Sequence, residues 1–320
     1  MRGRWGERAV TVTGAVRLLG ARDIREIAGR LGVHPTKRLG QNFVVEQGTV
    51  RQIAALAAVR PGDVILEVGP GLGSLTLALL GAIVEAAGVG PGLVSMRLVA
   101  VEIDPVLAGE LPRTISERAP DFADLVTVLT ADALAVGEKE IGAPAPTVLA
   151  ANLPYNVAVP VVLHLLAALP SLERGVVMVQ AEVADRMCAG PGSRVYGIPS
   201  AKLAWYANAK PAGTVPRGVF WPVPNVDSKL VAFTRHDPPT TTVSREEVFA
   251  VIDAAFGQRR KTLRAALAGW AGSPAKAEAA LRAAGVDPGA RGEALTVTEF
   301  ARIAQSGREA HATAAKIVDR

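Results

Sequence analysis

Residues 64–76 read VILEVGPGLGSLT, and this stretch decides the fold class. Its first five residues are apolar apart from Glu67, as in a buried strand, and the apolar run after the glycines predicts a helix. Between the two, Gly69, Gly71 and Gly73 allow positive φ angles and a close approach of the backbone to a ligand. The stretch therefore predicts a strand, a glycine-rich turn and a helix whose first N–H groups are free to bind.

Further apolar runs follow, with helical segments between them. The runs are continuous rather than alternating, which is typical of strands buried on both faces of a mainly parallel sheet. The six predicted strands comprise residues 64–68, 98–103, 125–130, 147–151, 175–180 and 229–233. We therefore expect an α/β fold whose ligand site lies at the carboxyl ends of these strands.

The spacing of the glycines distinguishes two kinds of cofactor turn. A dinucleotide-binding fingerprint requires its third glycine at position 74, which is a serine here. The observed Gly-x-Gly-x-Gly spacing, preceded by Glu67, instead resembles the first motif of class I methyltransferases that use S-adenosylmethionine (SAM). This resemblance implies a Rossmann-like α/β domain with SAM as cofactor, whereas a purely structural turn is the alternative.

Acidic residues stand at the ends of the next two predicted strands. Glu102 is placed to accept both hydrogen bonds of a ribose diol, and Asp132 could accept from an adenine amino group. Asp104 is the alternative to Glu102 as the ribose contact, and a helix-capping acid is the alternative to a ligand role for Glu102. A glycine turn and two acids at one edge of a sheet together indicate a nucleotide-like cofactor.

The next strand ends in Asn152, Leu153, Pro154 and Tyr155. The lone pair of an adenine N6 is delocalised into the ring, so hydrogen-bond acceptors on both N–H groups are needed to hold the amine in a reactive geometry. The Asn152 oxygen and a carbonyl of Leu153 or Pro154 can supply them, while Pro154 stiffens the loop. Tyr155 offers a face on which an extruded base can stack. We interpret the motif as an amine clamp, and a capped surface turn is the alternative.

Composition excludes several other classes of protein. The apolar fraction of 49% supports a folded core, and the single Cys188 has no disulfide partner. The four histidines show no metal-ligand spacing, so no metal is expected. Residues 75–94 contain several glycines and predict a core helix with a connection rather than a membrane span. No signal peptide is recognisable, and we expect a cytoplasmic protein without a membrane partner.

The net charge of +5 is unevenly distributed. Residues 1–51 contain ten Lys and Arg against four Asp and Glu, residues 52–235 contain 13 against 16, and residues 236–320 contain 12 against ten. Basic ends beside a slightly acidic centre suit a polyanionic partner, although solvated helix faces would produce the same count.

The chain divides into three predicted regions. Residues 1–20 are expected to form a mobile extension, residues 21–236 the α/β domain, and residues 243–310 a small helical domain after a Pro- and Thr-rich joint. Four helical segments are predicted in the last region, comprising residues 244–256, 258–270, 275–285 and 296–305.

The motifs together resemble a known family. RLGQNFV, EVGPGLGSLT, VEID, ADAL, ANLPYNVAVP, GVFWPVPNVDSKLV and AFGQRRKTLRAAL are similar, in this order, to the ribosomal RNA adenine N6-dimethyltransferases, and most to their small-subunit (KsgA) branch. The resemblance covers about residues 21–305. It implies dimethylation of two adjacent adenosines in the 3′-terminal hairpin of 16S rRNA, in the small subunit or its precursor. Nothing in the sequence suggests an obligate dimer, so a monomer is expected.

The resemblance also implies roles for individual residues. SAM contacts are implied for Asn42, Val44, Gly69, Glu102, Asp132 and Asn152. The implied adenine pocket comprises Asn152, Leu153, Pro154, Tyr155 and the second aromatic wall Phe220. Predicted RNA contacts are Lys37 and Arg38 in a basic loop, and Arg259, Arg260, Lys261 and Arg264 in the helical domain.

The basic cluster at residues 259–264 raises a question about its helix. If one helix extended from Glu246 to Leu267, Arg259 would share the apolar face of Ile252 and Phe256. Either Gly257 ends that helix or Arg259 packs at the domain interface, and the sequence leaves both open.

Two other functions remain as alternatives. A large-subunit 23S rRNA methyltransferase of the antibiotic-resistance (Erm) type shares the cofactor motifs and the Asn-Leu-Pro-Tyr motif. A ribosome assembly factor that acts mainly by binding would need no turnover, although the intact cofactor turn favours catalysis.

Overall fold

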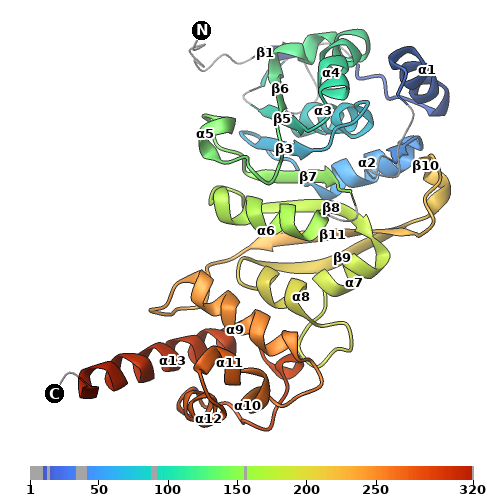
Figure 1. The fold of residues 1–320 in the computed structure, drawn as a ribbon. Helices are drawn as coiled ribbons and strands as arrows, with labels where there is room; N and C mark the ends of the chain where they lie inside the picture. The colour runs from blue at the N-terminus through green and yellow to red at the C-terminus, as the bar shows by residue number, and fades with distance from the viewer. Residues whose placement is uncertain are drawn as a thin grey trace. The chain divides into compact units, whose positions relative to one another are not determined.

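The computed structural model describes residues 10–12, 15–33, 42–87, 92–94, 96–154 and 157–318, and Figure 1 shows their arrangement. Side chains are described outside residues 10–12, 92–94 and 311–318. Tyr155, Lys37 and Arg38, all predicted site residues, lie outside the described residues, as does most of the predicted N-terminal extension. No helix in the described ranges is both long enough and apolar enough to cross a membrane.

The chain folds around a seven-stranded sheet with the strand order β6-β5-β3-β7-β8-β11-β9 (Figure 1). In sequence order, its strands are β3 (Val64–Val68), β5 (Arg97–Glu102), β6 (Val126–Thr130), β7 (Val148–Asn152), β8 (Arg174–Gln180), β9 (Ala207–Val215) and β11 (Ser228–Arg235). The first five strands in this order, β6, β5, β3, β7 and β8, pair in parallel, and β11 is antiparallel to β8. The predicted mainly parallel sheet is confirmed, and β9 is a strand that the sequence pattern did not reveal.

Burial explains why these strands have continuous apolar runs. Every side chain of β3 is buried, so helices or loops must cover both faces of the sheet at its centre. The helices of this part are α1 (Ala21–Leu31), α2 (Gln47–Leu56), α3 (Ser74–Ala87), α4 (Pro105–Arg118), α5 (Glu138–Ile141), α6 (Ala158–Ala168) and α7 (Ala181–Met187). Helix α1 ends at Leu31 and is capped by Gly32, which has a φ of 64°.

Two short antiparallel pairs lie outside the main sheet. Strand β1 (Val10–Val12) pairs with β4 (Gly92–Val94), and β2 (Phe43–Val44) pairs with β10 (Phe220–Trp221). The second pair, which we call the β2–β10 ribbon, joins segments that are more than 170 positions apart in the sequence. No local pattern predicts such a pair, because neither strand is long enough to show a period.

The chain separates into two compact units. Unit 1 extends through Ala184 and includes Lys210–Arg235, and unit 2 comprises Asp185–Ala209 and the chain from His236 onward. The predicted boundary near residue 236 coincides with the return of the chain into unit 2 at His236. The segment 185–209, which we predicted within the α/β domain, belongs to unit 2. Its Lys202 forms an ion pair with Asp253, and the Tyr196 hydroxyl donates to the Leu295 carbonyl at 2.8 Å.

Unit 2 is built from short helices around an aromatic core. Its helices are α8 (Ile198–Leu203), α9 (Arg245–Gly257), α10 (Leu263–Ala266), α11 (Ala268–Ala271), α12 (Pro274–Ala283) and α13 (Val297–Val318). The ring of Phe256 lies between those of Tyr196 and Phe300, with centroid distances of 5.8 and 6.1 Å. Short 3-10 segments occur at Pro120–Leu125 and Arg217–Val219 in unit 1 and at Gly292–Ala294 in unit 2.

The predicted helix over residues 258–270 is wrong at its start. Helix α9 ends at Gly257, and the chain turns through Gln258–Thr262 before α10 begins at Leu263. Of the two alternatives for Arg259, the structure therefore shows the one in which Gly257 ends the helix. Because the helix breaks, Arg259 leaves the apolar face and forms an ion pair with Glu293 at 3.3 Å.

Candidate active site

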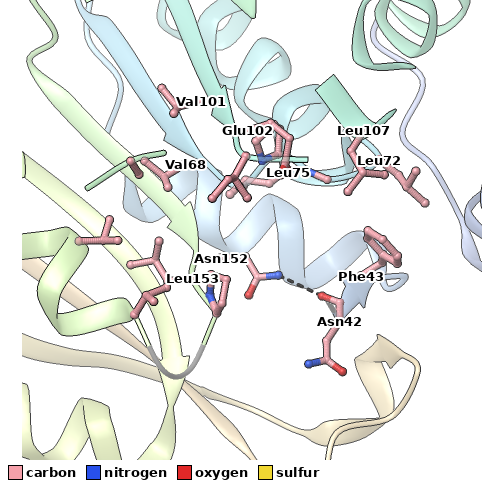
Figure 2. A pocket seen from close by; sticks show the side chains of 18 of the residues that line it. Asn42, Phe43, Val68, Leu72, Leu75, Val101, Glu102, Leu107, Asn152 and Leu153 are labelled. Carbon is pink, nitrogen blue, oxygen red and sulfur yellow. Dashed lines mark hydrogen bonds between the residues drawn. The ribbon is translucent and has the colours of Figure 1, made fainter. Parts of the chain in front are cut away.

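One pocket in unit 1 collects most of the predicted site residues (Figure 2). It lies at the carboxyl ends of β3, β5 and β7 and just beyond the end of β6, as expected for a sheet of this type. Of the predicted residues, its lining includes Asn42, Val44, Gly69, Gly71, Glu102, Asp132, Asn152, Leu153, Pro154 and Phe220. Segments from position 42 to position 220 therefore meet at one cavity.

The glycine turn has the backbone conformation that its sequence predicts. Gly69, Gly71 and Gly73 have φ angles of 71°, 57° and 97°, which other residues adopt only with strain. A Cβ atom at Gly71 would lie 3.1 Å from the Phe43 ring. Gly73 is absent from the pocket lining, and a Cβ atom there would lie 3.0 Å from Leu111 of α4. The structure therefore gives Gly73 a packing role between two helices.

Glu102 and Asp104 have clearly different surroundings. Glu102 is buried at the pocket, where its carboxylate accepts from the N–H groups of Gly71 at 3.1 Å and of Asp104 at 3.0 Å. Burial raises the pKa of Glu102 above its ordinary value, and these two N–H groups oppose that change. Asp104 caps α4 by accepting from Val106 and Leu107, and it is not part of the lining. The geometry therefore favours Glu102 over Asp104 as a ligand contact.

Asp132 lies at the pocket with two exposed apolar side chains. Its carboxylate accepts from the N–H of Leu134 at 2.9 Å, which fixes the turn after β6. Ile103 and Leu134 are 61% and 39% exposed, and both line the pocket. Exposed apolar side chains beside acids can hold the faces of a planar ring while the acids bind its polar edges. Our sequence reasoning missed both residues, although each follows a predicted acidic residue within two positions.

The Asn152 side chain is held in one orientation. Its amide nitrogen donates to the Asn42 carbonyl at 3.2 Å (Figure 2), so the amide oxygen is left to accept from a ligand. Leu153 is buried, and its N–H donates to the Met178 carbonyl at 3.1 Å. The Pro154 carbonyl accepts from the N–H of Val157 at 3.2 Å. These bonds give the segment 152–154 a fixed course along the pocket.

The β2–β10 ribbon completes the pocket wall. Phe220 of β10 is buried and lines the pocket, as the family resemblance implies. The next residue, Trp221, stacks on Phe43 of β2 with a centroid distance of 6.3 Å and an interplanar angle of 24°. The Ser74 hydroxyl at the start of α3 donates to the Val44 carbonyl at 2.8 Å. The ribbon thus holds Phe220 and the Asn42 carbonyl beside the glycine turn, and Phe43 is a wall residue that our sequence reasoning missed.

Glu67, which precedes the glycines, does not line the pocket. It is fully buried, and one carboxylate oxygen accepts from the Thr76 hydroxyl at 2.7 Å. Burial raises the pKa of Glu67 to about 8, so the carboxyl is mainly neutral at pH 7. Its role in the structure is a link between β3 and α3.

The four predicted basic residues of unit 2 fall into two pairs. Arg259 and Arg264 form ion pairs with Glu293 and Glu278, at 3.3 and 3.0 Å, and Arg259 also donates to the Arg194 carbonyl. Arg260 and Lys261 are exposed in the turn between α9 and α10, and neither has an ion pair within the described part of the chain. The described residues contain no cluster of acids, His and Cys suited to a metal ion.

The fold and the pocket define a class of protein. A parallel α/β sheet with a glycine turn after its central strand, an acid after the next strand and a pocket at their carboxyl ends is the Rossmann-like fold of the class I methyltransferases. Within this class, the chain belongs to the ribosomal RNA adenine dimethylase family, whose model matches residues 34–308.

Individual relatives agree with this assignment. Two proteins named ribosomal RNA small subunit methyltransferase A, from Kineococcus radiotolerans and Streptomyces avermitilis, are 63% and 62% identical to this chain. The alignments cover 90% and 92% of this chain, and 91% and 96% of the relatives.

Solved structures show the same fold. The 23S rRNA methyltransferase ErmE has a TM-score of 0.58 with 26% identity, covering 83% of this chain and 100% of ErmE. A dimethyladenosine transferase from Plasmodium falciparum has a TM-score of 0.64 with 21% identity, covering 82% of this chain and 95% of its own.

Proposed function

We propose that this protein dimethylates N6 of two adjacent adenosines in the 3′-terminal hairpin of 16S rRNA, with SAM as methyl donor. The observation that carries the proposal is the Asn152 amide, whose nitrogen bonds to the Asn42 carbonyl so that its oxygen can accept from an amine. The choice of the small subunit is supported by relatives of that name at 63% identity, against 26% for the large-subunit enzyme ErmE. We further propose that the protein acts in the cytoplasm, as a monomer, on the small subunit or its precursor.

The pocket fits SAM through contacts that differ for each part of the cofactor. Glu102 would accept from the ribose hydroxyls, and Asp132 from the adenine amino group. Ile103 and Leu134 would hold the two faces of the adenine ring. Gly69 and Gly71 line the pocket with positive φ angles, and the missing Cβ atom at Gly71 leaves room for the Phe43 ring of the pocket wall. When bound, SAM supplies an electrophilic methyl group on a sulfonium.

The described residues act on the amine by holding it. The Asn152 oxygen and the carbonyl of Leu153 or Pro154 would accept the two N6 hydrogens, which frees the nitrogen lone pair from the ring. Phe220 would stack on the extruded adenine, and Tyr155 would supply the opposite face. No general base is required, because the alkylated nitrogen is acidic and releases its proton to water. Positioning and hydrogen bonding then supply the catalysis.

Unmethylated ribosomal subunits provide the direct test of this function. Purified protein and labelled SAM would be incubated with small and large subunits in parallel, and the modified nucleosides identified by mass. Dimethyladenosine in the 3′-terminal hairpin of the small subunit is expected. Label confined to the large subunit would assign the protein to the Erm type instead, and no label in either would contradict both.

Cofactor affinity should depend on pH through Glu102. A carboxylate accepts both ribose hydroxyls, whereas its protonated form offers fewer acceptors. Because the pKa of Glu102 is raised by burial, affinity should fall as the pH decreases and should begin to fall at a higher pH than for an exposed glutamate. Titration calorimetry with S-adenosylhomocysteine over about pH 5 to 8 would measure this.

Glu102→Gln is the variant that isolates this dependence. It should bind S-adenosylhomocysteine about ten- to a hundredfold more weakly at pH 8, as expected for the loss of a hydrogen bond to a charged group. Its affinity should also lose most of the pH dependence. A wild-type affinity that is constant over this range would show that Glu102 does not contact the ribose.

Charge reversal at Arg260 and Lys261 should weaken RNA binding. Both side chains are exposed and lack an ion pair within the described residues, so their charge is available to phosphates. Each lost phosphate contact should reduce the slope of log affinity against log salt by about 1. Arg260→Glu with Lys261→Glu, measured by filter binding to small subunits at several salt concentrations, checks this.

Lys276→Glu is the matched control for charge reversal. It makes the same change at an exposed position of α12 and should leave the salt slope close to that of the wild type. An unchanged slope in the double variant would show that the turn between α9 and α10 is only a solvated surface.

A further inference from the structure

The exposed apolar side chains of unit 1 are unevenly placed. Among the described residues, the large apolar side chains of this unit with substantial exposure are Ile103, Val106, Leu134, Val223 and Val226. Ile103 and Leu134 line the pocket, and Val106 lies in the first turn of α4. Val223 and Val226 are 64% and 42% exposed, and they share a loop, residues 222–227, which we call the valine loop.

The valine loop follows the pocket wall directly. Phe220 lines the pocket and Trp221 stacks on Phe43, so the two residues before the loop are fixed at the site. After the loop, Ser228 is fully buried and begins β11. The loop therefore starts two residues after Phe220, against which the adenine would stack, and its exposed valines follow Phe220 by three and six positions in the chain.

Several contacts hold the valine loop in one shape. The Arg217 N–H donates to the Asp227 carboxylate at 3.3 Å, and the Arg217 guanidinium lies 3.5 Å from the same carboxylate. The guanidinium also donates to the Asn225 carbonyl at 3.2 Å, and the Asp227 carbonyl accepts from the N–H of Ala181 at 3.0 Å. Pro224, in the middle of the loop, is buried. Valine side chains on such a loop remain in water without collapsing onto the protein.

A fixed apolar projection beside a base pocket has a specific use. Moving an adenosine out of a stack costs free energy, because the neighbouring bases lose their stacking partner. Proteins that open such steps insert apolar side chains into the gap, which restores contact with the exposed base faces. Surface valines are otherwise unremarkable, but this pair lies next to the wall that receives the base.

We propose that Val223 and Val226 form an apolar wedge that contacts the RNA bases beside the extruded adenosine and stabilises the open stack. The occupant of this surface is the substrate RNA itself, and the inference rests on the function proposed above. The wedge acts on extrusion rather than on methyl transfer, so it should affect the rate at saturating substrate more than the affinity for the subunit.

The test uses the full-length protein and unmethylated small subunits. The double variant Val223→Ser with Val226→Ser should lower the single-turnover methylation rate at saturating subunit about tenfold or more, with subunit affinity changed less than about twofold. In subunits carrying 2-aminopurine at the target position, the wild type should raise the fluorescence on binding, and the double variant should raise it much less. Thermal melting would verify that these exposed changes leave the fold intact.

Two further variants serve as controls. Val106→Ser makes the same chemical change at an exposed position outside the pocket lining and should behave like the wild type. Val223→Leu with Val226→Leu keeps apolar side chains on the loop and should retain most of the rate and of the fluorescence change.

The outcomes separate the wedge from the proposed function. Unchanged rate and fluorescence in the double serine variant would overturn the wedge, as would a loss of subunit affinity with a normal rate at saturation. A wild type that methylates no small subunit would instead overturn the function on which the wedge rests. Loss of rate and fluorescence together, with affinity retained, is the expected result.

Discussion

Replacing Asn152 with alanine should lower the rate of methyl transfer about a thousandfold. Asn152 supplies the acceptor that holds N6, and removing a single preorganised hydrogen-bonding group from an active site typically costs a factor of this size. The amide is already oriented by its bond to the Asn42 carbonyl, so its oxygen is a preorganised acceptor. Single-turnover methylation of small subunits measures this loss directly.

Binding measurements on the same variant distinguish catalysis from assembly. Subunit affinity should remain close to that of the wild type, since the RNA contacts that we propose in unit 2 are untouched. Affinity for S-adenosylhomocysteine should fall much less than the rate. A variant that transfers methyl groups at nearly the wild-type rate would contradict the amine clamp.

Replacing Asp63 with alanine should lower the free energy of unfolding by about 3 to 5 kcal/mol, because it removes the buried carboxylate that pairs with the Arg174 guanidinium and leaves only the largely exposed Glu173 as an ion-pair partner. Asp63 and Arg174 form an ion pair whose side chains are only 8% and 10% exposed. The Asp63 carboxylate also accepts from the Arg60 N–H at 2.6 Å and the Thr147 hydroxyl at 2.7 Å. Urea unfolding followed by circular dichroism would measure the change.

A double variant tests the reason for this loss. Asp63→Ala with Arg174→Met removes both members of the buried ion pair and should be more stable than Asp63→Ala alone, because no buried guanidinium is left without its buried carboxylate. If the double variant is the less stable of the two, the loss comes from packing and from the Arg60 and Thr147 contacts instead. Neither residue lines the pocket, so cofactor affinity at low temperature should be unchanged.

The sequence pattern predicted the main sheet well, because its strands β3, β7 and β8 are buried on both faces. Residues 64–68 match β3 at both ends, and the other five predicted strands begin and end within two residues of the observed ones. Strand β9 was missed because it lacks this burial on both faces. It lies at the sheet edge, where only its end residues Ala207 and Val215 are buried, and it includes Pro211 and Gly213, so it has no continuous apolar run.

The candidate site was predictable where its residues follow strands. Gly69, Glu102, Asp132 and Asn152 stand at or just after four strand ends, and parallel topology brings those ends to one edge. Phe43 could not be found in this way, because it reaches the pocket through the pairing of β2 with β10, far apart in sequence. The segment 185–209 was likewise misplaced, since its position depends on side-chain contacts with α9 and the chain before α13.

The sequence by itself determined the fold class, the order of the polar strand ends and the family, because these follow from local periodicity and from motifs read along the chain. Only the tertiary structure decided which acid faces the pocket, how the Asn152 amide is oriented and which basic side chains are already paired. Each of these depends on a contact with a residue distant in the chain, such as the Asn42 carbonyl for Asn152 or the Glu293 carboxylate for Arg259. Hydrogen bonds and ion pairs act over a few ångströms in space, and sequence distance carries no information about them.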